Sequence, residues 1–170
     1  NSIKQFTHFM NLVNIEYCIA ITQLLLNHGA KNLINESIYS IPEFTKKNIK
    51  NFRIISNPGC YPTSIQLALV PLIKKALIET NSITIDSKSG YSGAGKKYKS
   101  KFTHKNINNS VFAYGIEKHK HMSELDQQLN KVSKSKLEYN FNPHLLPTFR
   151  GILSTMYIKT KKSLGQNFLI

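Results

Sequence analysis

The chain has 170 residues, which is enough for one domain with a buried core. Its apolar content of 41% and charged content of 19% exclude an intrinsically disordered chain. The net charge of +14 is typical of nucleic-acid binding, but only two of the 23 basic residues are arginine. The lysines are scattered among asparagine and isoleucine, which indicates a bias of the coding DNA. We therefore expect no nucleic-acid partner, and a basic site would equally suit a small anionic ligand.

Cys18 and Cys60 are the two cysteines, and they lie in very different contexts. They predict no disulfide framework, and no residues have the spacing of metal ligands, so we expect no metal. The most apolar early run, residues 15–26, is interrupted by Glu16 and Gln23 and is too short to cross a bilayer. No signal-peptide pattern is found. The expectation is a reduced, cytoplasmic compartment without membrane contact.

The chain before residue 53 predicts little regular structure. Apolar residues near helical spacing predict a helix over 13–26, whereas residues 27–50 are polar and typical of a loop. Within that loop, Thr45 is expected to cap a short helix over 46–51. Residues 53–56 are then predicted to form a strand.

A strand, a tight turn and a helix start meet at Cys60. Pro58 fixes φ, Gly59 permits a sharp turn, and Pro62 suits the first turn of a helix. At a helix N-terminus, unpaired N–H groups and the helix dipole would lower the pKa of the Cys60 thiol and favour the nucleophilic thiolate. A buried structural cysteine is the alternative, and spacing alone leaves both interpretations open.

The longest helix is expected after this turn, because apolar residues recur at four-residue spacing. They are Ile65, Leu69, Ile73 and Leu77, flanked by Ala68, Leu72 and Ala76. A β-branched strand over 83–87 then leads into a glycine-rich loop, residues 89–95. Backbone N–H groups of this loop could cradle an anion. The loop lacks the lysine and serine of a phosphate-binding loop, so a surface turn is the alternative.

Two histidines, His119 and His121, precede a second helix whose N-cap is expected to be Ser123. The residues before them are predicted to form an exposed excursion (96–109) and an extended segment (111–116). The helix after them has a core stripe that consists of Leu125, Leu129 and Val132. Downstream of a candidate nucleophile, the pair resembles a Cys/His arrangement, whereas a lone histidine there would be structural.

The end of the chain predicts two strands with a break between them. Residues 137–141 alternate as a half-buried strand, residues 142–147 break it, and residues 151–159 resume the alternation. His144 lies between two prolines and is expected to be a packed loop histidine rather than an acid or base. Arg150 follows a turn and could bind a carboxylate or phosphate in bidentate fashion.

Six ordered motifs together resemble a known family. They occupy residues 39–43 (YSIPE), 56–63 (SNPGCYPT), 89–95 (SGYSGAG), 118–124 (KHKHMSE), 142–147 (NPHLLP) and 150–152 (RGI). From residue 28 to residue 157 the chain resembles N-acetyl-gamma-glutamyl-phosphate reductases of arginine biosynthesis. The resemblance implies an α+β fold, a mixed sheet with helices on one face, like the catalytic domain of glyceraldehyde-3-phosphate and aspartate-semialdehyde dehydrogenases.

Members of that family reduce N-acetyl-glutamyl phosphate to N-acetyl-glutamate semialdehyde with NADPH and release phosphate. The resemblance implies that Cys60 forms a thioester with the substrate, and that His121, with His119, manages the protons. Glu124 is expected to orient a histidine or to bind the substrate amide. The implied substrate-binding residues are Arg150, Glu124, Asn57 and Ser89, and the implied cofactor-binding residues are Ser92, Gly93, Ala94 and Gly95.

The resemblance also divides the chain into three parts. Residues 1–27 match poorly, as a remnant near the end of the nucleotide-binding domain. Residues 28–160 would form a catalytic, dimerisation-type domain, and the tail, residues 161–170, instead resembles the opening of rRNA adenine dimethyltransferases. No dinucleotide-binding G-x-G-x-x-G precedes a helix. We therefore expect an incomplete copy of an enzyme that is a homo-oligomer when intact, without steady NADPH oxidation by this chain alone.

Two alternatives remain from the sequence. An aspartate-semialdehyde dehydrogenase would use the same cysteine chemistry on a different acyl phosphate, but the paired histidines and residues 57–63 argue against it. The other alternative is a non-catalytic remnant that binds a partner. The reactivity of the Cys60 thiol would distinguish a catalytic cysteine from an inert one.

Overall fold

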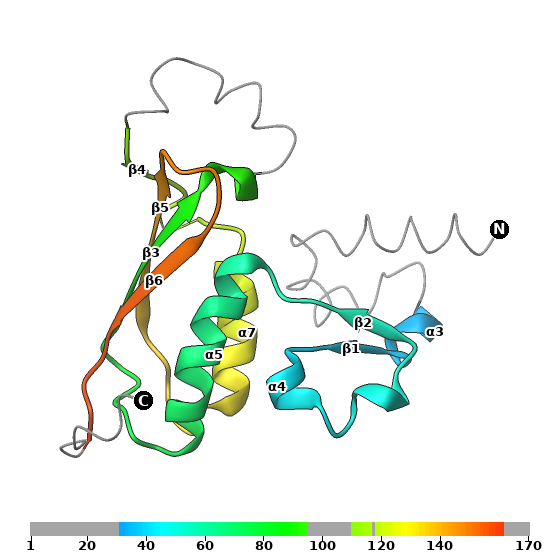
Figure 1. Ribbon diagram of the computed structural model, residues 1–170. Helices are drawn as coiled ribbons and strands as arrows, with labels where there is room; N and C mark the ends of the chain where they lie inside the picture. Colours follow the sequence, from blue (N-terminus) through cyan, green and yellow to red (C-terminus); the bar gives the residue numbers. More distant parts are fainter. Residues whose placement is uncertain (1–30, 95–109, 117, 162–170) are drawn as a thin grey trace.

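The computed structural model describes residues 31–94, 110–116 and 118–161 (Figure 1). The helices are α3 (Lys31–Ile34), α4 (Pro42–Thr45), α5 (Cys60–Lys74) and α7 (Met122–Val132), with short 3₁₀ segments η3 (Ile49–Asn51) and η4 (Tyr91–Ala94). The strands are β1 (Ser37–Tyr39), β2 (Ile54–Ser56), β3 (Ile83–Gly90), β4 (Phe112–Ala113), β5 (Tyr139–Leu146) and β6 (Ile152–Tyr157). None of the helices in these ranges is long and apolar enough to cross a membrane. The predictions for residues 13–26, for 96–109 and for the tail after residue 161 lie outside the described residues.

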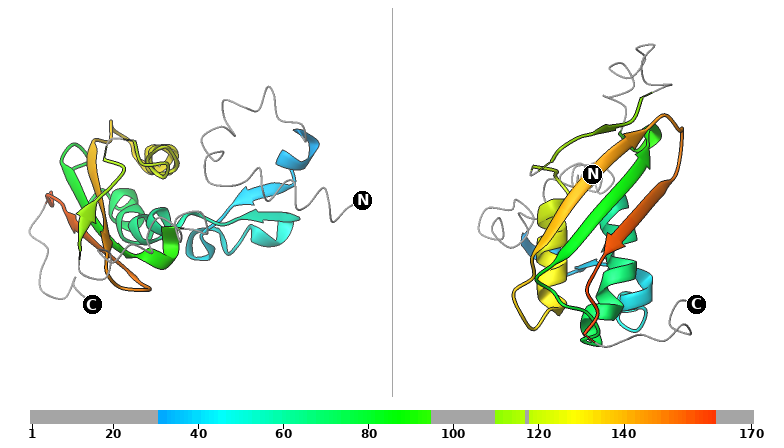
Figure 2. Two further views of the ribbon diagram at one scale, coloured as in Figure 1. Left: turned by 90° about the horizontal axis from the view of Figure 1, so that it is seen from above. Right: turned by 90° about the vertical axis from the view of Figure 1, so that its left-hand side faces the viewer.

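A mixed sheet forms the larger layer, with four strands in the order β4-β5-β3-β6. β5 is parallel to β3, β6 is antiparallel to β3, and β4 is antiparallel to β5. Helices α5 and α7 both cover one face of this sheet, and no helix of the described residues covers the other, which we call the open face (Figure 2). The predicted α+β fold, a mixed sheet with helices on one face, is confirmed.

The core lies between this sheet and the two helices, because each of these elements has one apolar face. On β3, buried Ile83 and Ile85 alternate with half-buried Thr84 and Asp86, as expected for a strand with one covered face. The fully buried side chains that meet β3 from the helices are Ile65 and Leu69 of α5 and Leu125 and Leu129 of α7. The sheet therefore holds α5 and α7 side by side, and both helices begin beside the candidate site.

Helix α5 confirms the predicted buried stripe, whose members are Ile65, Leu69 and Ile73. The helix ends at Lys74, however, so the prediction that it continues through Leu77 is wrong. Ala76 has a φ of 52°, and the N–H groups of Ala76 and Leu77 donate to the carbonyls of Ile73 and Leu72. This pair of bonds is a Schellman ending, which satisfies the last carbonyls and stops the helix.

β1 and β2 form a second, two-stranded sheet, and they run parallel. The predicted strand over 53–56 is confirmed, but the predicted loop over 27–50 is wrong at α3, β1 and α4. These elements have only three or four residues each, which is too short to show a helical or alternating pattern. Thr45 ends α4, where its hydroxyl donates to the Ile41 carbonyl at 3.0 Å, rather than capping a helix over 46–51. Because the strands are parallel, their last residues, Tyr39 and Ser56, lie opposite each other at the same end of this sheet.

Strand β5 runs through Pro143 and His144 to Leu146, so the predicted break at 142–147 is wrong. The N and O atoms of one residue point to the same side of a strand. The Pro143 carbonyl accepts the N–H of Tyr114, on the β4 side. The missing N–H of Pro143 therefore faces that side too, and it removes no bond between β5 and β3.

Helix α7 begins at Met122, with His121 as its N-cap, so the prediction of Ser123 as the N-cap is wrong. The turn before it is closed by the N–H of Met122, which donates to the His119 carbonyl at 2.9 Å. The prediction that both histidines lie in a constrained turn ahead of a helix is confirmed. Of the extended segment predicted over 111–116, only β4 is a strand, whereas the predicted strand over 151–159 is confirmed by β6.

Candidate active site

The turn between β2 and α5 places Cys60 as the first residue of α5, with Gly59 as the N-cap. Thr63 holds this turn from the helix side, since its N–H and its hydroxyl both donate to the Gly59 carbonyl at 2.9 Å. Cys60 is an exposed free thiol, so the alternative of a buried structural cysteine is wrong. The prediction that a helix starts at Cys60 is confirmed.

The electrostatics at Cys60 differ from the expectation. The pKa of its thiol is raised above the ordinary 9.0, because the protein around the sulfur displaces water. This effect outweighs the backbone N–H groups of Tyr61 and Cys60 and the charge of Lys120, which lower the pKa, while the charge of Glu124 raises it further. The predicted lowering is therefore wrong. At neutral pH the thiol holds its proton, and a nucleophilic role requires a base.

His121 lies against the turn that carries this thiol. A Cβ added at Gly59 would be 2.5 Å from the His121 Nε2 atom, so the ring packs directly on the residue before Cys60. His121 is 3% exposed, and neither of its ring nitrogens has a hydrogen-bond partner among the described residues. The structure thus places an imidazole with two available nitrogens beside the cysteine turn.

His119 holds the backbone of His121 through a hydrogen bond. Its Nδ1 accepts the backbone N–H of His121 at 3.1 Å, which assigns the proton of the neutral ring to Nε2. The rings of Tyr61, Tyr114 and Phe141 surround it, with centroid distances of 5.5, 5.4 and 5.4 Å. This aromatic cage holds His119, and His119 in turn fixes the backbone of His121.

Both imidazoles are neutral near pH 7. Burial lowers the pKa of His119 to about 4, with a smaller contribution from the charge of Lys120. Burial lowers the pKa of His121 to about 3, assisted by His119 and by Lys120. The site therefore combines a protonated thiol with an unprotonated imidazole, which has a free lone pair for the thiol proton but is a weak base at a pKa of about 3.

Glu124 reaches the cysteine turn from the first turn of α7 and is 1% exposed. Its Oε1 accepts the hydroxyl of Tyr39 at 2.6 Å and the N–H of Gly59 at 3.0 Å, whereas its Oε2 has no partner among the described residues. Burial raises the pKa of the Glu124 carboxyl, against the effect of these two hydrogen bonds. Neither of these partners belongs to the histidine pair, and the role expected for Glu124 toward a histidine or the substrate amide stays a prediction.

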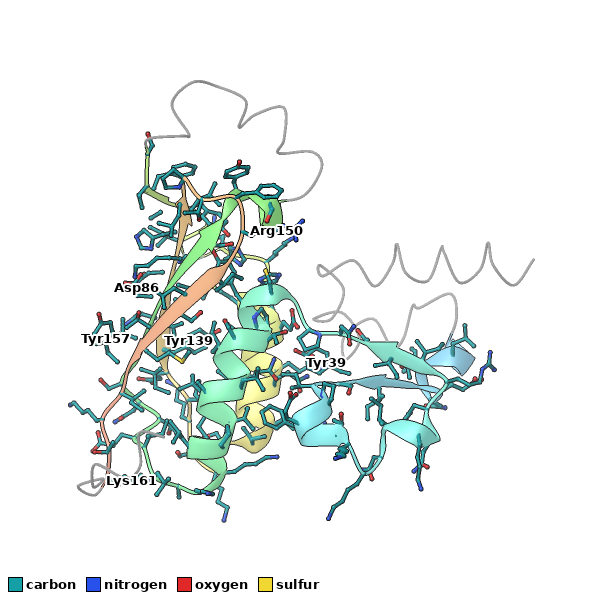
Figure 3. All side chains as sticks on the ribbon, in the orientation of Figure 1. Tyr39, Asp86, Tyr139, Arg150, Tyr157 and Lys161 are labelled. Carbon is teal, nitrogen blue, oxygen red and sulfur yellow. The ribbon has the colours of Figure 1, made fainter. Side chains whose placement is uncertain are left out.

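The other predicted substrate ligands differ in exposure. Arg150 is exposed in the turn between β5 and β6, with its guanidinium 5.2 Å from the Phe149 ring centroid (Figure 3). Asn57 is exposed in the turn before the cysteine. Ser89 is buried near the end of β3, and its hydroxyl donates to the carbonyl of the next residue at 3.0 Å. Arg150 and Asn57 could thus meet a ligand from solvent, and Ser89 could not without movement.

The described part of the glycine loop, residues 89–94, has regular secondary structure and does not form an anion-binding loop. Its first two residues belong to β3, and η4 follows directly. The N–H groups of Tyr91 and Ser92 donate to the carbonyls of Thr148 and Phe149, so they are not available to a phosphate. Ser92 and Gly93 are exposed, Ala94 ends η4, and Gly95 lies outside the described residues.

Sequence reasoning missed Gln66, Tyr61 and Tyr114. Gln66 is 2% exposed, and its amide donates to the Tyr39 hydroxyl at 2.7 Å. The Tyr114 hydroxyl donates to that of Tyr61 at 3.0 Å, beside the His119 ring. The signal for Gln66 was its place on the buried face of α5, because a glutamine there needs a polar partner.

Replacing Gly59 by alanine should displace His121 and slow the chemistry of Cys60. The φ of −62° at Gly59 suits any residue, so glycine is required there for space alone. An added Cβ would lie 2.5 Å from Nε2 and 2.9 Å from Cδ2 of His121. Because overpacking of this kind costs about 1–3 kcal/mol, we expect acylation of Cys60 to slow roughly tenfold or more. The exposed Ala68→Ser variant of the same helix should match the parent, and equal rates in all three proteins would contradict the contact.

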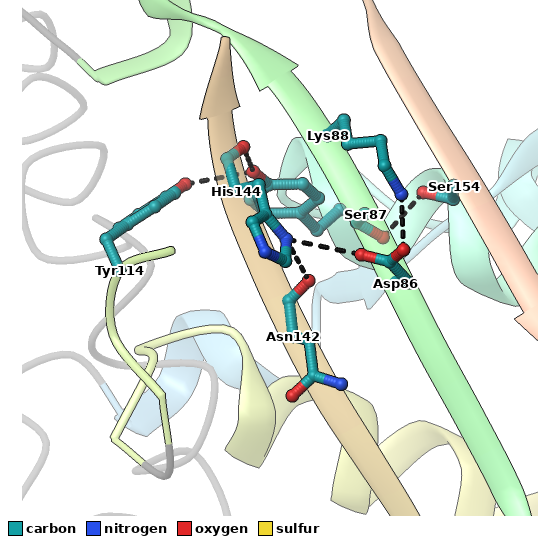
Figure 4. A network of polar contacts seen from close by, with 8 residues as sticks. Asp86, Ser87, Lys88, Tyr114, Asn142, His144 and Ser154 are labelled. Carbon is teal, nitrogen blue, oxygen red and sulfur yellow. Dashed lines mark hydrogen bonds and ion pairs between the residues drawn. The ribbon is translucent and has the colours of Figure 1, made fainter. Parts of the chain in front are cut away.

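A separate polar cluster lies on the open face of the sheet (Figure 4). Asp86 on β3 forms an ion pair with Lys88 and lies 3.2 Å from Nδ1 of His144 on β5. The cluster borders a shallow pocket of about 400 Å³, lined by Thr84, Asp86, Ala113, Ile116, Asn142, His144 and Tyr157. The prediction of His144 in a loop is wrong, because it lies within a strand. Its side chain is on the face opposite the cysteine helix.

The sequence is similar to that of several known proteins. It is 47% identical over 144 residues to the N-acetyl-gamma-glutamyl-phosphate reductase of Caldicellulosiruptor saccharolyticus, covering 85% of this chain and 42% of that protein. It is 44% identical over 132 residues to a probable chloroplastic N-acetyl-gamma-glutamyl-phosphate reductase of Arabidopsis thaliana, covering 78% of this chain and 33% of that protein. The chain thus spans less than half the length of these relatives.

Structural comparison and the family match agree. Aspartate semialdehyde dehydrogenase II from Vibrio cholerae superposes with a TM-score of 0.54 at 18% identity, over 76% of this chain and 46% of that chain, which shows a shared fold. Residues 60–169 match the family described as semialdehyde dehydrogenase, dimerisation domain. The match begins at the cysteine of α5 and includes both histidines and the four-stranded sheet. The chain therefore belongs to the semialdehyde dehydrogenase dimerisation-domain family.

Proposed function

We propose that this chain carries the acyl-accepting site of an N-acetyl-gamma-glutamyl-phosphate reductase. The observation that carries the proposal is the position of Cys60 at the start of α5, with the His121 ring packed on the preceding residue. The relatives at 47% and 44% identity support N-acetyl-glutamyl phosphate as the substrate. Exposed Arg150 and Asn57 are the proposed ligands of this anion.

The first half of the reaction needs only residues of this chain. The Cys60 sulfur attacks the carbonyl carbon of the acyl phosphate while His121 accepts the thiol proton. The backbone N–H groups of the first turn of α5 are the proposed donors to the developing oxyanion. The bond between the carbonyl carbon and the phosphate oxygen then breaks, and phosphate leaves. The products of this half are a thioester on Cys60 and phosphate, and the proton that His121 accepted passes on to phosphate or solvent, because the pKa of His121 is about 3.

The second half requires a hydride, which NADPH supplies when bound. The described part of the glycine loop fits only one portion of that molecule. Exposed Ser92 and Gly93 could contact its neutral nicotinamide end, but the N–H groups of Tyr91 and Ser92 are already used and cannot hold the pyrophosphate. Once the thioester is reduced, the thiohemiacetal alkoxide would re-form its carbonyl by breaking the bond to the Cys60 sulfur, and the released thiolate would take up a proton by way of His121.

The proposal predicts a single acylation, at Cys60. The chain incubated with an acyl phosphate should gain one hydroxylamine-labile acyl group, located by mass spectrometry on the peptide that contains Cys60. Cys60→Ser should gain none, and Cys18→Ser should behave like the parent. An acyl group distributed equally over both cysteines, or absent from Cys60, would contradict the proposed function.

A second copy of the chain is the proposed partner, in keeping with a dimerisation domain. On β6, Leu153 and Tyr157 pair with residues of the open face and are 62% and 61% exposed. Large apolar side chains beside a polar cluster are typical of interfaces between subunits. Leu153→Asp should therefore raise the dissociation constant of the dimer at least tenfold in analytical ultracentrifugation. An unchanged sedimentation profile would assign dimerisation to another face.

The exposed thiol of Cys60 fits a reducing compartment such as the cytoplasm.

A further inference from the structure

Three elements that are distant in the sequence meet at one oxygen atom beside the cysteine turn. The Oε1 atom of Glu124, on α7, accepts the Tyr39 hydroxyl from the end of β1 and the Gly59 N–H from the N-cap of α5. The Tyr39 hydroxyl in turn accepts an N–H of the Gln66 amide, about two turns further along α5. The result is a continuous chain of hydrogen bonds from the small sheet to both long helices.

Burying the polar side chains of Glu124 and Gln66 lowers the stability of the fold, which indicates that these residues have a role other than packing. Glu124 is 1% exposed and Gln66 is 2% exposed, and a buried carboxylate or amide destabilises a fold unless its hydrogen bonds are satisfied. The next residue of α7, Leu125, buries an apolar side chain, whereas Glu124 buries a carboxylate of which only Oε1 has hydrogen-bond partners among the described residues.

The group that Glu124 holds is the residue before the nucleophile. The Gly59 carbonyl is already held by Thr63, from within α5. Glu124 holds the Gly59 N–H from α7, so both backbone groups of Gly59 are fixed, each by a different element. Because α7 begins directly after His121, one helix carries both the imidazole and the carboxylate that fixes the cysteine turn.

We propose that Glu124 is a positioning residue, which sets the cysteine turn against His121 through the Gly59 N–H, and that Tyr39 and Gln66 hold its carboxylate in place. This inference rests on the proposed role of Cys60 as the nucleophile. In this role Glu124 acts through its Oε1 atom as a hydrogen-bond acceptor, not through the negative charge of its carboxylate. The charge acts in the other direction, because it raises the pKa of the Cys60 thiol.

The two contributions can be separated with two variants. Glu124→Gln keeps an acceptor oxygen for Tyr39 and Gly59 and removes the charge, whereas Glu124→Ala removes both. The readout is the pH profile of iodoacetamide alkylation at Cys60 in the full chain, with the Cys60 and Cys18 peptides resolved by mass spectrometry. A matched control is Asp126→Asn. Asp126 is a second carboxylate of α7 that accepts a tyrosine hydroxyl, that of Tyr139, at 2.8 Å.

We expect the alkylation midpoint of Glu124→Gln to move to lower pH, because a negative charge near the thiol is lost. We expect Glu124→Ala to alkylate about tenfold more slowly than Glu124→Gln at pH 7.5, because the turn no longer presents its N–H groups to the sulfur. Asp126→Asn should follow the parent. Coincident profiles of Glu124→Gln and Glu124→Ala would overturn the proposal, since charge alone would then explain the effect.

If circular dichroism shows that Glu124→Ala does not fold, a second pair of variants tests whether Glu124 positions the cysteine turn. Tyr39→Phe removes the hydroxyl that donates to Oε1 of Glu124, and Tyr139→Phe removes a comparable hydroxyl that donates to Asp126 and to the Met122 carbonyl instead. We expect Tyr39→Phe to alkylate about threefold more slowly than Tyr139→Phe at pH 7.5, and equal rates would overturn the proposal. Failure of the parent chain to take up an acyl group would refute the proposed function, while these alkylation comparisons would still report on the turn.

Discussion

His121→Asn should slow the acylation of Cys60 by roughly 10²–10⁴, the usual range for loss of a general acid–base. The thiol holds its proton at neutral pH, since its pKa is raised, and His121 is the neutral imidazole packed on the adjacent residue. Because the pKa of His121 is lowered to about 3, the rate for the parent chain should show no inflection near pH 6.5. Single-turnover acylation followed by mass spectrometry between pH 5 and 8 measures both effects.

Two further histidine variants make this test specific. His144→Asn changes a histidine on the open face of the sheet and should leave the acylation rate within about twofold of the parent. His119→Asn should slow acylation about tenfold, since it removes the acceptor that holds the His121 backbone but not the base itself. If His119→Asn were the slower of the two site variants, the roles assigned to the pair would be reversed.

The chain should lose stability steeply on acidification below pH 6.5. Both buried histidines have pKa values far below 6.5, at about 4 and about 3, so the unfolded chain binds protons that the folded chain excludes. Their contribution to stability is present above pH 6.5 and is lost as the pH falls toward 4 and 3. The slope should approach about 1.4 kcal/mol per pH unit for each histidine. Denaturant unfolding followed by circular dichroism at pH 7, 6, 5 and 4 measures it.

Glu124 opposes this trend, because a carboxyl whose pKa is raised in the folded state stabilises the fold as the pH falls. Two histidines against one carboxyl leave a net loss of stability in acid. His121→Asn should have a visibly shallower dependence on pH than the parent, whatever its stability at pH 7. His144→Asn should retain the slope of the parent, and a parallel slope for His121→Asn would show that His121 is not buried in the neutral form.

The sequence predicted those parts of the fold that depend on local pattern. The Ile65–Leu69–Ile73 stripe and the strand over 151–159 each need only neighbouring residues, and both are confirmed. The sharp turn expected at Gly59 is wrong, because Gly59 is extended, with a φ of −62° and a ψ of 164°. The cysteine at a helix start and the two histidines ahead of the next helix follow from the same kind of evidence. Spacing therefore located the site, although it did not describe the contacts within it.

What the sequence could not show depends on distant residues. The Tyr39–Glu124 bond joins positions 85 residues apart, and no spacing rule predicts it. The pKa of Cys60 follows from how much protein surrounds the sulfur, which the helix-dipole argument ignored. Strand β5 passes through Pro143 because its missing N–H happens to face β4, a fact of sheet order rather than of composition.

Pro143 also has a consequence for how this sheet meets other molecules. An exposed strand edge offers unpaired N–H and C=O groups, which can recruit strands from other chains and lead to aggregation. Along the β4 side of β5, strand pairing stops after Ala113, the Tyr114 N–H still donates to the Pro143 carbonyl, and Pro143 has no N–H to offer in return. The proline therefore ends the ladder on the side where β4 is only two residues long, and it removes one donor that a strand from another molecule would need there.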